Sequence, residues 1–294
     1  MAKAAATATD HAPPTGSGFR NRAYRLSLRR LGRLALLAPA ALALGYILTP
    51  MVFVTWLAFF AQEIPSFPPE GYSLKWFAAI PSNDRFLSGF VLSLEVGIAA
   101  TLIGLAVGVP AAFCLSRTRF RGRQVVDSLL LLPLVVPGIV LGMALYVFHV
   151  ETEIHTGLPI LGSLGGLIAG HVLVVIPWTV RLVTASLAGL DHSIEEAAQS
   201  LGANRWTTFR LVTLPSILPG VVAAALFGFV SSFGNLEMSL FLVGPGRTTL
   251  PIAILQYLEW KIDPTIAAVS VLQILLIAVA MLWTDRYVKI SRVV

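Results

Sequence analysis

Long apolar runs alternate with short polar segments along this chain of 294 residues. A helix that spans a bilayer needs about 20 largely apolar residues in a row. Six runs are long enough, and they lie at residues 34–60, 86–116, 125–148, 160–187, 216–243 and 265–284. The pattern therefore predicts an all-α polytopic membrane protein with six transmembrane helices.

Polar segments flank these runs at both ends of the chain. We predict that residues 1–33 form a tail, partly disordered because its first part is rich in Ala, Thr, Pro and Gly. Residues 34–284 form the predicted transmembrane domain, and residues 285–294 form a second tail. The first run is about twice as long as the core of a usual signal peptide, so we expect it to remain as an uncleaved anchor.

Composition supports a membrane protein. Charged residues make up 12% of the chain and hydrophobic residues 56%, whereas a soluble domain carries about 25% charged residues. The mean hydropathy is +0.80. The net charge of +6 does not indicate a nucleic-acid partner, because the basic residues flank the apolar runs and do not gather on one face.

The distribution of lysine and arginine predicts the orientation. Of the 21 basic residues, 17 lie in the two tails, in the 117–123 loop and in the 181–213 region. Six crossings place these segments on one side, and an excess of positive charge marks the cytoplasmic side. Both termini are therefore predicted to be cytoplasmic. The loop RTRFRGR (117–123) could also contact anionic membrane lipid.

The polar stretch between the fourth and fifth runs predicts two short helices. Ser193 and Glu196 have the spacing of a capping box, so a helix is expected to start at Ser193. Gly202 is placed to end it, because glycine accepts the left-handed conformation readily. Asn204 can cap a second helix, which Pro215 is expected to stop.

This stretch could serve as a docking surface. Ala197 and Ala198 would allow another backbone to approach closely, and Trp206 and Phe209 are aromatic anchors of the kind enriched at interfaces. An ordinary amphipathic surface helix, in which Glu196 is only a cap, remains the alternative.

A longer motif in this stretch resembles the signature of permease subunits of bacterial ABC importers. That signature reads EAA, three residues, G, nine residues, I, one residue, LP. The residues at the matching positions are Glu196, Ala197, Ala198, Gly202, Leu214 and Pro215, with Val212 in place of isoleucine.

The resemblance implies a fold, partners and a location. It implies the six-helix, MetI-like permease fold of type I importers in a bacterial cytoplasmic (inner) membrane. Two related permease subunits would enclose the pore, and an external binding protein would deliver the solute. Coupling helices at about 191–214 would sit in a cytoplasmic ATPase dimer. That dimer would bind ATP and Mg²⁺, so this chain would need no cofactor and would be no enzyme.

Shorter segments resemble one branch of that family. GYSLKWF (71–77), TRFRGR (118–123) and LFLVGPGRTTLP (240–251) look like the second permease of spermidine/putrescine importers. The resemblance implies a small polar solute, a polyamine or a related compound. One departure weakens a simple polyamine assignment: acidic residues common before the outer end of the fifth span are replaced here by Gly234-Asn235, and the acid appears as Glu237.

Three polar residues inside the runs are candidates for the solute pathway. A charge at the bilayer centre costs roughly 2.5–3.5 kcal/mol on insertion scales, so such residues usually face a cavity or a partner. Glu95 lies in the second run, and Asn235 and Glu237 lie in the fifth. The two carboxylates could instead reach outward to water or pair within a subunit interface.

Two other function classes fit less well. A self-sufficient secondary transporter or channel predicts internal repeats and ion-coupling residues at mid-membrane, and the sequence has no convincing repeat. A membrane enzyme needs a catalytic or metal-ligating set, yet the sequence contains no HExxH, GxSxG or GxxxxGK[ST]. We therefore predict neither catalytic nor metal-binding residues, and ATP must bind to a partner.

Overall fold

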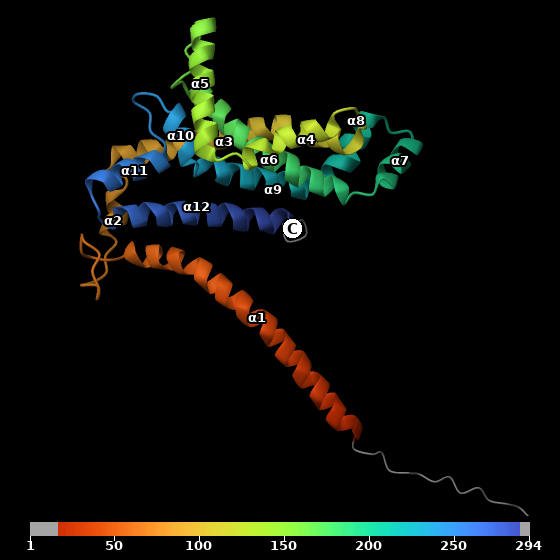
Figure 1. The fold of residues 1–294 in the computed structure, drawn as a ribbon, viewed down its shortest axis with the longest axis horizontal. Coiled ribbons are helices and arrows are strands. Elements are labelled where there is room, and N and C mark those ends of the chain that lie inside the picture. The colour runs from red at the N-terminus through yellow and green to blue at the C-terminus, as the bar shows by residue number, and fades with distance from the viewer. Residues whose placement is uncertain (1–16, 289–294) are drawn as a thin grey trace, which may run out of the picture. The chain divides into compact units, whose positions relative to one another are not determined.

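The computed structural model of this protein describes residues 17–288, and all regular elements in that range are helices. The chain divides into two compact units, Met1–Val54 and Thr55–Val294. The helices (Figure 1) are α1 (Ser17–Leu57), α2 (Lys75–Ala79), α3 (Asp84–Arg117), α4 (Arg123–Leu131), η1 (Leu132–Leu134), α5 (Gly138–Thr156), α6 (Leu164–Ala188), α7 (His192–Ser200), α8 (Arg205–Thr208), η2 (Phe209–Thr213), α9 (Leu214–Phe233), α10 (Leu236–Leu242), α11 (Leu250–Trp260) and α12 (Thr265–Val288).

Within the described residues, five helical stretches are long and apolar enough to cross a membrane, and a bent pair could supply a sixth. The five are Leu37–Leu57, Asp84–Arg117, Leu164–Ala188, Arg205–Phe233 and Thr265–Arg286. The all-α fold class is confirmed, and four of the six predicted runs correspond to one helix each.

The first unit is described as a single helix. α1 has 41 residues and begins at Ser17, well before the apolar run that the sequence places at 34–60. No proline lies between Ser17 and Arg33, so nothing in the backbone stops the helix from continuing into this polar stretch. The predicted tail is thus helical from Ser17 onward, while residues 1–16 and 289–294 lie outside the described residues.

Glycines bring the three long helices α3, α6 and α9 together in the second unit. A Cβ atom on Gly104 would lie 2.5 Å from Val175, and one on Gly108 would lie 2.6 Å from Thr179. From the other side, a Cβ atom on Gly228 would lie 2.7 Å from Val175. Bilayer tails are as apolar as the side chains, so helix association in a membrane depends on such close packing.

We expect Gly104→Val to destabilise this helix packing. The added side chain would overlap Val175, whose branched Cβ leaves it few rotamers, and overpacking of this kind costs about 1–3 kcal/mol. Thermal unfolding in detergent should show a lower midpoint. Gly165→Val is the matched control, because nothing lies within 4 Å of that position. Equal midpoints for the two variants would contradict the close packing.

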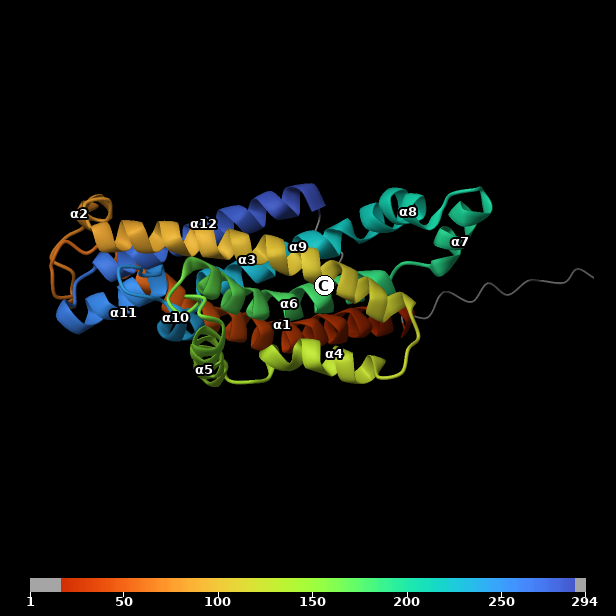
Figure 2. The same cartoon turned by 90° about the horizontal axis from the view of Figure 1, so that it is seen from above.

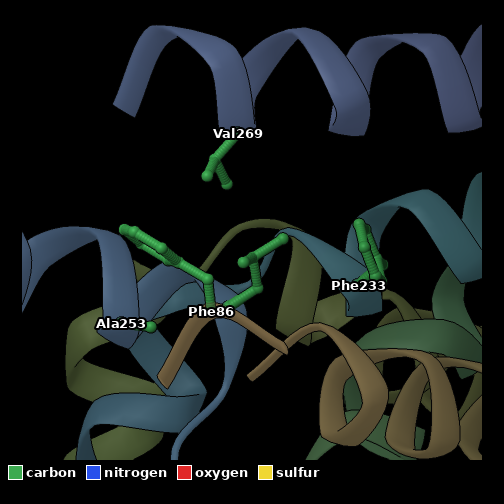
Figure 3. Close-up of a cluster of buried hydrophobic side chains, with 5 residues drawn as sticks. Phe86, Phe233, Ala253 and Val269 are labelled. Carbon is green, nitrogen blue, oxygen red and sulfur yellow. The ribbon is translucent and has the colours of Figure 1, made fainter. Parts of the chain in front are cut away.

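An apolar cluster joins α3, α9, α11 and α12 at one end of the unit. Its buried members are Phe86, Phe233, Leu250, Ala253 and Val269. Figure 3 shows Val269 pointing down from α12 towards the two phenylalanines. The cluster fixes α11 and α12 to the end of the unit that Figure 2 shows opposite α7 and α8.

The run predicted at 125–148 does not form one continuous helix. α4 and η1 are followed by α5 at an angle of 105°, and Figure 1 shows α5 standing across α3, α6 and α9. Pro133 and Pro137 cause the break, because each lacks a backbone donor and disfavours helical geometry in the residue before it. Pro137 is extended, with φ −54° and ψ 132°, and α5 starts immediately after it.

The run at 216–243 is also not one helix. α9 ends at Phe233, and α10 starts at Leu236. Between them Asn235 takes an extended conformation, and its side chain accepts a hydrogen bond from the Met238 N–H at 2.8 Å. An N-cap of this kind starts a new helix in place of continuing the old one.

Candidate functional site

The polar segment between α6 and α9 folds into short helical pieces at one end of the second unit (Figure 2). α7 comes first, a bend follows, and α8 and the π-helical segment η2 lead into α9. The predicted helix–bend–helix arrangement is therefore confirmed.

The start of α7 differs from the predicted capping box. The N-cap is Asp191, whose carboxylate accepts the Ser193 N–H at 2.9 Å. This hydrogen bond holds the pKa of the Asp191 carboxyl below its usual value. Ser193 lies inside the helix, so the capping box of Ser193 and Glu196 is wrong. Glu196 is exposed, and the cap of α7 does not need it.

The bend after α7 depends on Gly202, as predicted. Its φ is +92°, in the left-handed region that glycine adopts at little cost. Its N–H donates to the Gln199 carbonyl at 3.0 Å, and the Ala203 N–H donates to the Ala198 carbonyl at 3.1 Å. The second bond satisfies a carbonyl that the end of the helix would leave unpaired.

We expect Gly202→Ala to loosen this bend. A residue with a Cβ atom pays roughly 1–2 kcal/mol for the left-handed conformation, and no neighbour lies within 4 Å to clash with it. Amides of the last turn of α7 should exchange faster with deuterium. Gly202→Asn should perturb exchange less, because asparagine tolerates this conformation better. Equal exchange in all three proteins would contradict this account.

The second helix begins as predicted but does not end as predicted. Asn204 caps it by accepting the Thr207 N–H at 2.8 Å. Pro215 was expected to stop it, yet the helical residues run on without interruption from Arg205 to Phe233. Pro215 lies in the first turn of α9, directly after the π-helical register shift of η2, where its missing N–H is tolerated. α8 is therefore a direct extension of the membrane helix α9.

The remaining predicted docking residues differ in exposure. Trp206 is 68% exposed, while Phe209 is half-buried between the rings of Trp206 and Phe113. Ala197 and Pro215 are exposed, and Ala198 and Leu214 are half-buried. Three more exposed apolar side chains lie in the same segment, and they are Ile194, Leu201 and Leu211.

Glu195, the neighbour of Glu196, was not among the predicted functional residues. Glu195 is only 5% exposed. Its carboxylate lies 3.1 Å from Arg117 Nη2 and 3.2 Å from His192 Nδ1, and it accepts the Thr213 hydroxyl at 2.6 Å. The two consecutive carboxylates therefore differ in environment: Glu195 is buried against the protein, and Glu196 is exposed.

The predicted pathway residues come together only in part. Asn235 and Glu237 help to line a pocket of about 370 Å³ beside the break between α9 and α10. Glu95 is exposed on α3, and it is not among the residues that line this pocket.

The breaks in the third and fifth runs meet at Glu237. A Cβ atom on Gly138 would overlap the Glu237 carboxylate, and one on Gly142 would lie 2.9 Å from the Glu237 carbonyl oxygen. These glycines let the start of α5 lie against α10.

A hydrogen-bonded histidine fixes the break between α9 and α10. His171 is buried on α6, with Nδ1 2.9 Å from Ser232 Oγ and Nε2 3.3 Å from Ser239 Oγ. The Ser239 hydroxyl donates to the Asn235 carbonyl at 2.8 Å. Nε2 must therefore donate to Ser239, and Nδ1 accepts from Ser232. His171 is a packing group with both nitrogens engaged.

Within residues 17–288, no group of three or more His, Cys, Asp or Glu side chains could hold a metal ion. The arrangement leaves apolar side chains exposed in the α7–α8 segment and places polar residues at the break between α9 and α10.

Known proteins share the sequence pattern and the fold. The pattern of the family described as "Binding-protein-dependent transport system inner membrane component" matches residues 100–291. The putrescine transport system permease protein PotI of Escherichia coli is 29% identical over 232 residues, which cover 79% of this chain and 82% of PotI. A probable molybdenum ABC transporter permease protein of Haloferax volcanii is 34% identical over 194 residues, 65% of this chain and 72% of the relative.

Solved structures agree on the fold. A chain of a bacterial ABC transporter that imports the acidic polysaccharide alginate superposes with a TM-score of 0.69 at 16% identity, covering 91% of this chain and 98% of that one. A chain of the MetNI methionine ABC transporter gives a TM-score of 0.59 at 22% identity, covering 71% of this chain and 97% of that one. The predicted MetI-like permease fold is thereby confirmed.

Proposed function

Because this chain belongs to the family of binding-protein-dependent transport system inner membrane components, and is therefore a multi-pass permease subunit of an ABC importer, we propose that its α7–α8 segment docks on a cytoplasmic ATPase dimer. In this family ATP is hydrolysed on a separate subunit, so the chain is not an enzyme and needs no cofactor of its own.

The observation that carries the docking proposal is the exposure pattern of this segment. Glu196 is exposed, and its side chain does not cap α7. Around it, Leu201 is 90% exposed and Trp206 and Leu211 are each 68% exposed. Apolar side chains on a polar segment indicate a surface that a partner covers. Among these side chains, Trp206 is of the type enriched at interface hot spots.

We propose that this end of the molecule is cytoplasmic, with both termini on the same side. The connection from α3 to α4 carries Arg117, Arg119, Arg121 and Arg123, and it lies at the same end as α7 and α8 (Figure 2). Clustered arginines at one end of a helical membrane protein support a cytoplasmic location.

The complete importer would contain a second, related permease and an external binding protein. One chain would then supply half of the pathway, with the joint at Glu237 facing the partner permease. We propose that the ATPase changes conformation as it binds and hydrolyses ATP and so moves α7 and α8, and that α9 transmits this movement into the membrane.

We propose a cationic solute, a polyamine or a related amine. The relatives named for putrescine and for spermidine/putrescine are 29% and 28% identical. The carboxylate of Glu237 at the polar joint would attract an ammonium group. The relative named for molybdenum, at 34% identity, favours an oxyanion as the second candidate.

Affinity purification of the chain from its native membrane in mild detergent tests the importer proposal. Mass spectrometry should identify a nucleotide-binding ATPase and a second permease, and vesicles with this complex should take up solute only with ATP. A chain purified alone that transports in vesicles without ATP would contradict the proposal and favour a secondary transporter.

A further inference from the structure

We propose that Glu195 is a positioning residue that couples the docking helix α7 to the membrane helices α3 and α9. The inference rests on the proposed docking of an ATPase on α7. It assigns separate roles to two consecutive glutamates: Glu196 contacts the partner, and Glu195 transmits the movement into the permease.

The contacts of Glu195 come from three separate elements. Arg117 is the last residue of α3, and its Nη2 lies 3.1 Å from Glu195 Oε2. Thr213 is the last residue of η2, and its hydroxyl donates to Glu195 Oε1 at 2.6 Å. His192, in the first turn of α7, places Nδ1 3.2 Å from Oε2. Both carboxylate oxygens are therefore engaged.

Because the contacts of Glu195 are buried, they can form only when α7, α3 and η2 keep their present arrangement. The side chains of Glu195 and Arg117 are 6% and 16% exposed, so little water is present to replace a lost partner. A buried charge without its partner is strongly unfavourable. A displacement of α7 therefore has to carry Arg117 and Thr213 with it or break the cluster.

The elements joined here lead directly into the membrane. α3 and α9 both pack on α6, and glycines bring the three helices into close contact. Thr213 belongs to the π-helical segment that continues into α9, and such segments often mark functional sites in helices. A displacement of α7 would thus be transmitted to α3 and α9, two of the three central helices, through the Glu195 carboxylate.

The cluster also has unused hydrogen-bonding capacity. Arg117 Nε and Nη2 are buried and have no partner in hydrogen-bond geometry among the described residues, although Nη2 lies within ion-pair distance of Glu195. An arginine with a spare donor can exchange one partner for another. This capacity fits a contact that is remade as α7 moves, because coupling between sites requires an element with two arrangements.

Glu195→Gln tests the proposal in the complete transporter, purified with its ATPase and second permease and reconstituted in vesicles. Glutamine keeps the shape of the side chain and can still accept from Thr213, but it removes the charge that pairs with Arg117. We expect normal assembly and near-normal ATP hydrolysis, with about 5- to 100-fold fewer solute molecules imported per ATP. A residue with a merely structural role would lower assembly and hydrolysis together.

Arg117→Gln is the partner variant, and Arg117→Lys retains the charge. If the two residues act through each other, the double variant Glu195→Gln/Arg117→Gln should be no worse than either single variant. Arg117→Lys should recover part of the import per ATP. Additive losses in the double variant, or an unchanged ratio in Glu195→Gln, would overturn the proposal.

Two comparisons keep the result interpretable. If Glu195→Gln fails to reach the membrane, Thr213→Val removes the 2.6 Å hydrogen bond and leaves both charges. It should lower the import per ATP less than Glu195→Gln would, and an unchanged ratio would overturn the proposal. Glu196→Lys reports on docking alone: normal assembly in that variant would refute the docking surface, whereas lost assembly in Glu195→Gln would refute the positioning role.

Discussion

Replacing Glu196 with lysine should weaken ATPase binding about 100-fold or more and nearly abolish uptake, while the chain still folds and inserts. Glu196 is exposed, and Asp191 rather than Glu196 caps α7, so the fold loses little. At the proposed interface the substitution places a positive charge where the partner is adapted to a negative one. Like charges placed next to each other at an interface cost several kcal/mol of binding free energy. A loss of about 2.8 kcal/mol already corresponds to a 100-fold change in affinity.

The affinity of the purified ATPase for the permease in detergent measures this effect directly. Glu63→Lys is the matched control, because it makes the same change of charge at an exposed site in the loop before α2, at the other end of the unit (Figure 2). ATPase binding should be unchanged in Glu63→Lys. Equal binding by Glu196→Lys and the original chain would show that the ATPase docks elsewhere.

Local chemistry made the α7–α8 segment predictable from the sequence. Gly202 and Asn204 act within a few residues of their own positions, so their roles as helix end and helix cap could be read without the fold. The error at the start of α7 is of the same local kind. Asp191 and Ser193 are both good N-caps and lie two residues apart, and only one of them can cap the helix.

Hydropathy alone did not reveal that two of the apolar runs are broken. Residues 125–148 and 216–243 are largely apolar, and hydropathy does not record the direction of the backbone. Pro137 gave a signal of a kink in the sequence, but the 105° angle depends on how α5 packs on α10. Asn235 also gave a signal, because a capping residue within an apolar run can start a new helix.

The difference between Glu195 and Glu196 could not be predicted from sequence. Neighbouring residues on a helix point about 100° apart, so a helix that lies against a surface can bury one of two consecutive glutamates and expose the other. Which one does so depends on where α3 ends and where Arg117 reaches α7. That contact joins residues 78 positions apart in the sequence.

Glu237→Gln should lower uptake of a diamine about 10- to 100-fold. A hydrogen bond to a charged group contributes about 1.5–3 kcal/mol, and each 1.4 kcal/mol corresponds to a factor of ten. Glutamine has nearly the same shape, so the close contacts of this residue with Gly138 and Gly142 should remain. Uptake of radiolabelled putrescine by the reconstituted importer, with its binding protein, measures the effect.

Glu259→Gln is the matched control for this prediction. Glu259 is exposed on α11, and it undergoes the same loss of charge away from the joint between the broken helices, so uptake should be unchanged. The same vesicles distinguish the two candidate solutes. If the carboxylate recognises a cation, Glu237→Gln weakens diamine uptake and leaves molybdate excluded. If the solute is an oxyanion, the carboxylate opposes its passage, and the same substitution should raise molybdate uptake. Unchanged uptake of both solutes would remove Glu237 from the pathway, and its carboxylate would then serve only the packing of α5 against α10.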